Sequence, residues 1–239
     1  METDGGTVNA EASRKGLRRI EIGSVVGLAA GIVGLALPIA LVLLASYSPG
    51  TLLLTGAQLV EVTAILAIAG ALLFAICLLS FRLGFSSLRG FDRRFWTASV
   101  LCMLGTIGVV LLVIPIAIAF ASSDAIANCI RGAPSHALTC VRSVSPLASY
   151  GAVAAFWLLW LGGLGVVIGV GLAASRFHQA WFYGGAAAYA VLLLGLLGPT
   201  LGLLVPLGPL TYPLLAAPVL ILLASGMTFQ GSRRAVARG

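Results

Sequence analysis

Two cysteines in a polar stretch of the chain have the clearest capacity for chemistry. Cys129 and Cys140 lie in the segment 122–146, between two long apolar runs. Two thiols in one loop on the oxidising side of a membrane typically form a disulfide bond. Closing so short a loop would stabilise the fold by about 2–3 kcal/mol. We therefore predict a structural disulfide between Cys129 and Cys140.

Two other roles for these loop thiols stay open. Membrane thiol oxidases need closely spaced reactive thiols, typically Cys-x-x-Cys, and a partner that relays electrons. The spacing here is wider, and the remaining cysteines, Cys77 and Cys102, lie inside apolar runs. A metal site would combine both loop thiols with His136, and Asp124 is near enough in sequence to be a fourth ligand. The residue types favour the disulfide.

Glu61 is the one acidic residue, out of seven, that falls clearly inside an apolar run. A charge at the membrane centre costs at least ~2.5–3.5 kcal/mol, so a carboxylate there is a candidate proton or cation site. Glu61 also lies about one turn from the end of its run, where it would face lipid headgroups. No second carboxylate lies inside a run, which argues against a pump built on an acidic pair.

Patterns of other catalytic classes are missing from the sequence. The chain has no GxxxxGK[ST] phosphate loop, no HExxH and no Gly-x-Ser-x-Gly elbow. His136 and His178 fall on opposite sides of the membrane in the threading given below, so they cannot share a haem or a metal. We therefore expect a protein without a catalytic residue, cofactor or metal.

The composition places the chain in a membrane. Of its 239 residues, 60% are hydrophobic and 9% are charged, and the mean hydropathy is +1.10. A soluble domain carries roughly 25% charged residues, because water must wet its surface. The net charge of +7 is divided among several loops. This distribution excludes a nucleic-acid-binding domain and fits a membrane-orientation signal.

The apolar runs predict an all-α fold, a polytopic transmembrane helical bundle with six spans. The first run is too long for the h-region of a cleavable signal peptide and long enough to cross a bilayer. A tight turn over 206–209 makes the last two spans a hairpin, with one broken re-entrant helix as the alternative. The spans are predicted at about 22–45, 58–80, 97–121, 147–175, 184–205 and 210–229, between a disordered basic tail over 1–20 and a basic tail over 230–239.

The cationic residues orient these spans. Six spans divide the loops and tails between two sides, and Arg131 and Arg142 are the cations of one side. The other side has both termini and the remaining 12 of the 14 Lys and Arg residues. By the positive-inside rule, both termini are cytoplasmic and the protein is multi-pass in the cell membrane. The 12 residues are Arg14, Lys15, Arg18, Arg19, Arg82, Arg89, Arg93, Arg94, Arg176, Arg233, Arg234 and Arg238.

Glycines recur at helical spacing inside the predicted spans. In lipid, helices associate through close backbone contact, which small residues four apart allow. These glycines would either line a pore or moving interface, or serve plain helix packing, which is the more common role. The pairs are Gly27 and Gly31, Gly165 and Gly169, and Gly198 and Gly202.

The segment 81–96, FRLGFSSLRGFDRRFW, predicts a short amphipathic interfacial helix between spans two and three. Arg82, Arg89 and Arg93 fall within about 40° on a helical wheel, and the aromatic residues share a separate arc. Basic residues would face anionic headgroups and aromatics the acyl boundary. The segment is an orientation signal or a docking face for lipid or a partner, formed by Arg82, Arg89, Arg93, Arg94, Phe85, Phe95 and Trp96.

Three stretches of the chain resemble a known family. They are the basic opening GLRRIEIGSVVGLAAGIVGL, the segment FRLGFSSLRGFDRRFW and the run TASVLCMLGTIGVVLLVIP. Together they resemble the archaeal membrane-protein family known as domain of unknown function 973, in layout over most of the chain. The resemblance implies a multispan archaeal membrane protein, and no activity, cofactor or catalytic residue. The Cys129–Cys140 loop does not match that pattern, so its disulfide rests on local chemistry.

These features favour a structural or accessory membrane subunit that binds other membrane proteins over an enzyme. Its partners would be the lipid bilayer and other membrane proteins, or a second copy of the chain, bound through small-residue helix faces. One alternative is a small transporter or channel with a bundle-internal site near Glu61. The other is a membrane thiol redox enzyme.

Overall fold

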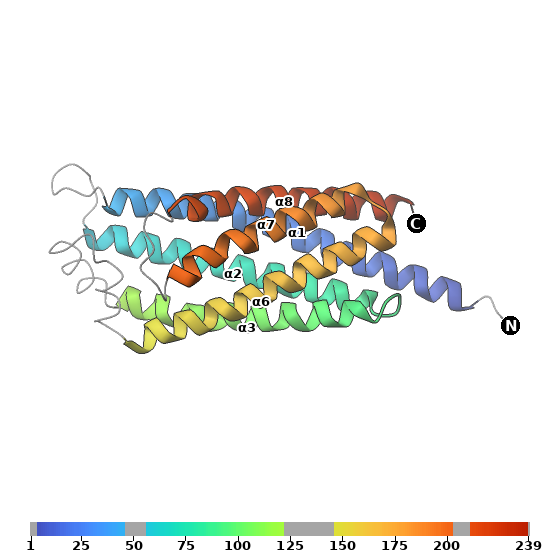
Figure 1. The fold of residues 1–239 in the computed structure, drawn as a ribbon, viewed down its shortest axis with the longest axis horizontal. Helices are drawn as coiled ribbons and strands as arrows, with labels where there is room; N and C mark the ends of the chain where they lie inside the picture. Colours follow the sequence, from blue (N-terminus) through green and yellow to red (C-terminus); the bar gives the residue numbers. More distant parts are fainter. Residues whose placement is uncertain (1–3, 46–55, 122–145, 203–210, 239) are drawn as a thin grey trace.

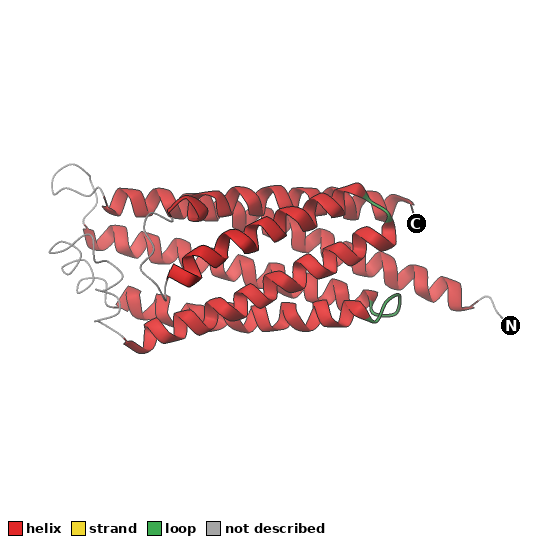
Figure 2. Ribbon diagram, in the orientation of Figure 1, coloured by secondary structure: helices red, strands yellow, loops and turns green. Residues whose placement is uncertain are grey.

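The computed structural model describes residues 4–45, 56–121, 146–202 and 211–238. These residues form six helices that run up and down along one long axis (Figure 1). Helix is the regular structure throughout the described part, with short loops between some helices (Figure 2). The helices are α1 (Asp4–Ala45), α2 (Gly56–Leu88), α3 (Arg94–Ala121), α6 (Pro146–Phe177), α7 (Ala180–Gly202) and α8 (Thr211–Arg238).

Within the described residues, four helices are long and apolar enough to cross a membrane. Their apolar stretches are Glu11–Ala36, Ala64–Leu88, Arg94–Ile114 and Val153–Phe177, and α7 has a shorter one over Ala180–Gly195. Large apolar side chains also point outward: Ile32, Val110 and Leu194 are each more than 60% exposed. Such surfaces suit lipid rather than water. The chain is thus an integral membrane protein with an all-α bundle.

Neighbouring helices pack in an order that follows the chain. α1 packs on α2 and α8, α2 on α3, α3 on α6, and α7 on both α6 and α8. Both termini lie at one end of the bundle, together with the α2–α3 and α6–α7 turns (Figure 1). This arrangement agrees with the alternation that the sequence predicts. α7 and α8 are two separate helices, whereas the predicted turn over 206–209 lies outside the described residues.

The basic N-terminal segment differs from the disordered tail predicted over 1–20. α1 begins at Asp4, and Leu17 and Ile20 are buried. The backbones of α1 and α2 approach closely here, since a Cβ on Gly16 would lie 3.1 Å from the carbonyl oxygen of Gly84. Apolar residues in this part of α1 therefore pack against α2. The charged residues around them in the sequence give no sign of this contact. The predicted basic C-terminal tail belongs to α8, which continues to Arg238.

The predicted interfacial helix over 81–96 is wrong. α2 continues without a break to Leu88, a turn follows, and α3 begins at Arg94. The aromatic side chains of Phe85 and Phe95 are fully buried rather than placed in the acyl boundary. A helical face of apolar residues suits the bundle interior as well as a lipid surface, so the wheel pattern alone does not decide between them. Gly84 provides a contact with α1 instead of weakening the helix.

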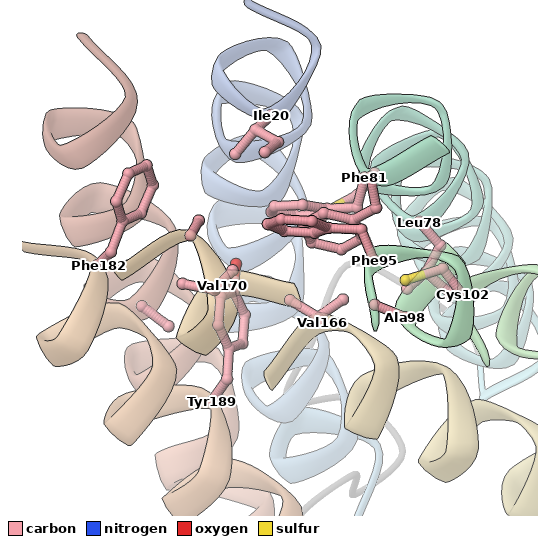
Figure 3. Packing of buried hydrophobic residues seen from close by; sticks show 14 of the residues in the cluster. Ile20, Leu78, Phe81, Phe95, Ala98, Cys102, Val166, Val170, Phe182 and Tyr189 are labelled. Carbon is pink, nitrogen blue, oxygen red and sulfur yellow. The ribbon is translucent and has the colours of Figure 1, made fainter. Parts of the chain in front are cut away.

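A cluster of stacked aromatic rings lies in the core (Figure 3). The rings of Phe81 and Phe85 stack with centroids 5.7 Å apart, and those of Phe85 and Phe95 with centroids 6.1 Å apart. Tyr189 of α7 meets Phe81 edge-on at 6.3 Å. Gly169 of α6 leaves the space that the Phe85 ring occupies. The cluster joins α2, α3, α6 and α7, and two of its members, Phe81 and Tyr189, line the cavity described next.

Candidate functional site

The bundle contains an apolar cavity of about 450 Å³. This volume lies within the roughly 300–1,000 Å³ of small-molecule binding sites. Each of the six described helices contributes side chains to its wall. Examples, in chain order, are Ala30, Phe74, Val109, Leu159, Leu192 and Ile221.

Small residues on α1 and α2 leave the room for this cavity. Gly27 and Gly34 of α1 line it together with Ala67 and Gly70 of α2. A Cβ on Gly70 would meet the Cγ1 atom of Val33 at 3.8 Å, an ordinary van der Waals contact. The wall can therefore accept a larger side chain at Gly70, which makes that position suitable for filling the cavity by mutation.

The cavity wall carries few polar atoms and no charge among the described residues that line it. The hydroxyl oxygens of Tyr189 and Ser225 lie 2.9 Å apart and share a hydrogen bond. The indole N–H of Trp160 donates to the carbonyl oxygen of Leu193 at 3.2 Å, which holds the indole ring against the wall. An ion would lose its hydration here without gaining an opposite charge. The wall suits a neutral, largely apolar molecule.

Glu61 does not belong to this cavity. It is exposed near the start of α2 and is absent from the lining residues. Within the part of the chain that the structure describes, no three His, Cys, Asp or Glu side chains gather where they could hold a metal ion. Glu61 therefore lies apart from the described residues that line the cavity.

The predicted docking residues divide into two groups. Phe85 and Phe95 are buried in the core, so they cannot contact lipid or a partner, and this part of the prediction is wrong. Trp96 is 53% exposed at the start of α3. Of the predicted arginines, Arg89, Arg93 and Arg94 are exposed and Arg82 is partly buried. The surface that remains for docking consists of these arginines and Trp96.

Asp92 organises the turn at this basic end. Its carboxylate accepts a hydrogen bond from the backbone N–H of Arg94 at 2.9 Å and so caps the start of α3. It also forms an ion pair with Arg176 of α6, with N and O 2.9 Å apart. The backbone hydrogen bond, and after it the Arg176 guanidinium, lower the pKa of Asp92 below its ordinary value. Asp92 thus links the start of α3 to the end of α6.

Two other arginines at this end contact neighbouring helices. Arg19 of α1 donates to the hydroxyl of Ser87 on α2 at 3.0 Å. The guanidinium of Arg234 lies 5.3 Å from the ring centroid of Trp181, within the range of a cation–π contact. Several arginines of this end therefore also hold helices together.

Two of the four cysteines lie within the described residues, and two do not. Cys129 and Cys140, with His136 and Asp124, lie outside the described residues, so the disulfide stays a prediction. Cys77 and Cys102 are free and buried.

Two of the three glycine pairs pack closely against neighbouring helices, and Gly27 also lines the cavity. A Cβ on Gly27 would meet Ser225 of α8 at 2.5 Å, and one on Gly31 would meet Leu222 of α8 at 2.8 Å. A Cβ on Gly165 would meet Leu101 of α3 at 2.7 Å, and Gly169 receives the ring of Phe85. The environments of Gly198 and Gly202 lie outside the described residues.

Sequence reasoning missed the cavity and its hydroxyl pair. A tyrosine and a serine inside the apolar runs of α7 and α8 were the available signal, since hydroxyls in a membrane helix need partners. Their pairing depends on how the two helices rotate against each other, which the apolar pattern does not specify. No protein-family model, curated protein or solved structure matches this chain. The resemblance to domain of unknown function 973 stays a prediction.

Proposed function

We propose that this protein is a six-span cell-membrane protein that binds a neutral, apolar molecule of the bilayer in its central cavity. Its role is that of an accessory binding protein rather than an enzyme. The observation that carries the proposal is the cavity of about 450 Å³, lined by all six described helices and free of charge among its described lining residues. A lipid molecule can reach such a site from the surrounding bilayer without crossing water.

The energetics of such a site favour shape over simple apolarity. A lipid molecule that leaves the bilayer for an apolar cavity gains little hydrophobic free energy, because both surroundings are apolar. Dispersion contacts between the occupant and the wall supply the gain instead. We therefore expect the cavity to select molecules that fill it, and we expect a bound molecule to raise the thermal stability of the protein.

The proposed orientation places both termini in the cytoplasm. It is supported by the two termini and the α2–α3 and α6–α7 turns lying at one end of the bundle (Figure 1). That end carries the basic residues that the positive-inside rule assigns to the cytoplasm. Labelling of single cysteines introduced at Gly90 and at the C-terminus of α8 with an impermeant maleimide, on intact cells, tests it. Labelling of either site without permeabilisation would contradict the orientation.

Lipid analysis of a cavity-filled variant tests the binding proposal. The protein is purified in mild detergent, and the lipids that accompany it are extracted and identified by mass spectrometry. Gly70→Leu should displace the bound molecule, since position 70 lines the cavity. Gly171→Leu is the matched control, because a Cβ there meets nothing within 4 Å. Equal lipid content in wild type and both variants would overturn the proposal.

An accessory subunit that binds other membrane proteins is the second candidate. The glycine pairs used within the bundle do not support it, but other glycines do. Gly151, Gly171 and Gly195 have open space where a Cβ would stand, so another helix could approach their backbones closely. Purification from native membranes in mild detergent tests this role, and recovery of the protein alone would count heavily against it.

The remaining alternatives have less support. A transporter or channel built around Glu61 would need that carboxylate inside the bundle, and it is exposed. A thiol redox enzyme would depend on Cys129 and Cys140, which lie outside the described residues. Both stay predictions from the sequence.

A further inference from the structure

Two buried hydroxyl groups give the cavity one polar corner. Tyr189 on α7 and Ser225 on α8 are 7% and 0% exposed, and their oxygens lie 2.9 Å apart. Both residues line the cavity. Figure 3 shows Tyr189 extending into the bundle core among the buried apolar side chains. A polar pair at this depth in a membrane protein needs a physical reason, because burying hydroxyls is costly unless they are hydrogen-bonded.

The hydrogen bonds of this pair leave one donor over. Two hydroxyls carry two protons, and the bond between Tyr189 and Ser225 uses one of them. The hydroxyl of a serine or threonine in an apolar helix usually donates a hydrogen bond to the carbonyl oxygen four residues earlier. Ser24 and Thr228 do so here, at 2.9 and 2.8 Å. Within the described part of the chain, the structure shows no such bond for Ser225. The pair can therefore donate one further hydrogen bond.

Two other groups converge on the same corner. A Cβ on Gly27 of α1 would lie 2.5 Å from the Oγ atom of Ser225 and 3.4 Å from the Sγ atom of Cys77 on α2. Gly27 and Cys77 also line the cavity. The corner is thus formed by α1, α2, α7 and α8, and glycine at position 27 is what allows the hydroxyl and the thiol to approach the α1 backbone.

We infer that the molecule bound in the cavity is a neutral lipid with an apolar body and a hydrogen-bond-accepting oxygen, and that the Tyr189–Ser225 pair recognises this oxygen. The inference rests on the proposed binding function. A carbonyl, ester or ether oxygen accepts the spare proton, and the apolar body fills the rest of the wall. A carboxylate or an ammonium group does not fit, because the described lining residues offer no opposite charge.

One hydrogen bond sets the expected difference in affinity between an oxygen-bearing lipid and a hydrocarbon. The usual net free energy of one intramolecular hydrogen bond corresponds to a change of roughly 2- to 10-fold in affinity. The oxygen-bearing lipid should therefore bind roughly 2- to 10-fold more tightly than a hydrocarbon of the same length. Loss of the hydroxyl pair should remove this difference and leave the affinity for the hydrocarbon nearly unchanged.

Fluorescence of a single tryptophan measures both affinities. Trp160 lines the cavity, so a bromine-labelled molecule bound there should quench its emission. The reporter protein carries Trp96→Phe, Trp157→Phe and Trp181→Phe and is reconstituted into lipid nanodiscs. The two probes are the methyl ester of dibromostearic acid and dibromooctadecane. The free dibromostearate anion is a third probe, expected to bind more weakly than the ester.

Variants of the hydroxyl pair decide the outcome. The double variant Tyr189→Phe/Ser225→Ala should reduce the ester affinity to that of the hydrocarbon, because either change alone leaves one hydroxyl proton that can still be donated. Tyr183→Phe is the matched control, since Tyr183 is on the same helix and is 54% exposed. Equal binding of ester and hydrocarbon by the wild type would overturn this inference alone. Failure of every probe to quench Trp160 would overturn the proposed function as well.

Discussion

The contact between Gly105 and Gly162 offers the sharpest test of how the bundle is held together. Gly105 of α3 and Gly162 of α6 meet backbone to backbone: a Cβ on Gly105 would lie 2.5 Å from the Cα of Gly162. A Cβ on Gly162 would approach the Cα of Gly105 equally closely. The perturbation is Gly162→Ala, which adds one methyl group where no flexible side chain can move aside.

The magnitude follows from this geometry. Ordinary contact begins at 3.4 Å, so the two helices must separate by roughly 1 Å. Sliding or rotation gives little relief, because Gly108 and Gly165 are also tight, with atoms of the facing helix within 2.8 Å of a Cβ at either position. Overpacking of this kind costs about 1–3 kcal/mol of stability. Alanine also favours helix over glycine by about 0.5–1 kcal/mol, which partly offsets the loss.

A control on the same helix removes the second effect. Gly171 is also in α6, and a Cβ there meets nothing within 4 Å. Gly171→Ala and Gly162→Ala share the gain in helix propensity, so their difference reports the steric cost alone. We expect Gly162→Ala to be less stable than Gly171→Ala by about 1–3 kcal/mol.

Unfolding by SDS in mixed micelles, followed by tryptophan fluorescence, measures this difference. Gly105→Ala should reproduce the loss from the other side of the contact. If Gly162→Ala and Gly171→Ala agree within about 0.5 kcal/mol, the close approach of α3 and α6 at this point is refuted.

Three further predictions concern other parts of the bundle. The pKa of Asp92 is lower in the folded chain than its ordinary value of 3.8, so its contribution is present above that pH and lost as the pH falls through the folded pKa. Asp92→Asn keeps a capping side chain but loses the ion pair with Arg176. Its Tm should therefore be lower than that of the wild type at neutral pH, and the two values should converge in acid. A Tm difference that stays constant with pH would contradict this. Phe85→Ala should cost about 3–5 kcal/mol of stability in the same SDS assay, because the ring is fully buried, whereas Phe91→Ala at an exposed ring should cost little. The thiol of Cys102 should react with a membrane-permeant maleimide after unfolding and not before, since it is fully buried; rapid labelling of the folded protein would show that its surroundings open.

Much of the fold could be predicted from apolar length and charge. Runs of about 20 apolar residues predict helices, because the bilayer leaves no other way to satisfy the backbone. The basic residues also predict that both termini and the α2–α3 and α6–α7 turns share one end, and the structure agrees with this (Figure 1). The boundaries were less accurate: α1 begins at Asp4 and α2 continues to Leu88, since charged residues at a helix end do not stop the helix.

The site was harder to predict, and Phe85 shows why. In a soluble protein, an apolar residue on a polar helix marks the buried face. In this bundle, the interior and the lipid are both apolar, so an inward Phe85 and an outward Leu194 have the same sequence signal. The prediction that Phe85 faces the acyl boundary was wrong for this reason.

The sequence by itself thus determined the class of protein, its helices and the basic end, because composition and charge respond directly to the bilayer. The tertiary structure decided which face of each helix points inward. Through that choice it placed Gly27 and Gly70 around a cavity and brought Tyr189 and Ser225 to 2.9 Å from each other. These contacts depend on the rotation and approach of helices whose faces are mostly apolar, and packing between small and large side chains, together with a few interhelical hydrogen bonds, determines that rotation.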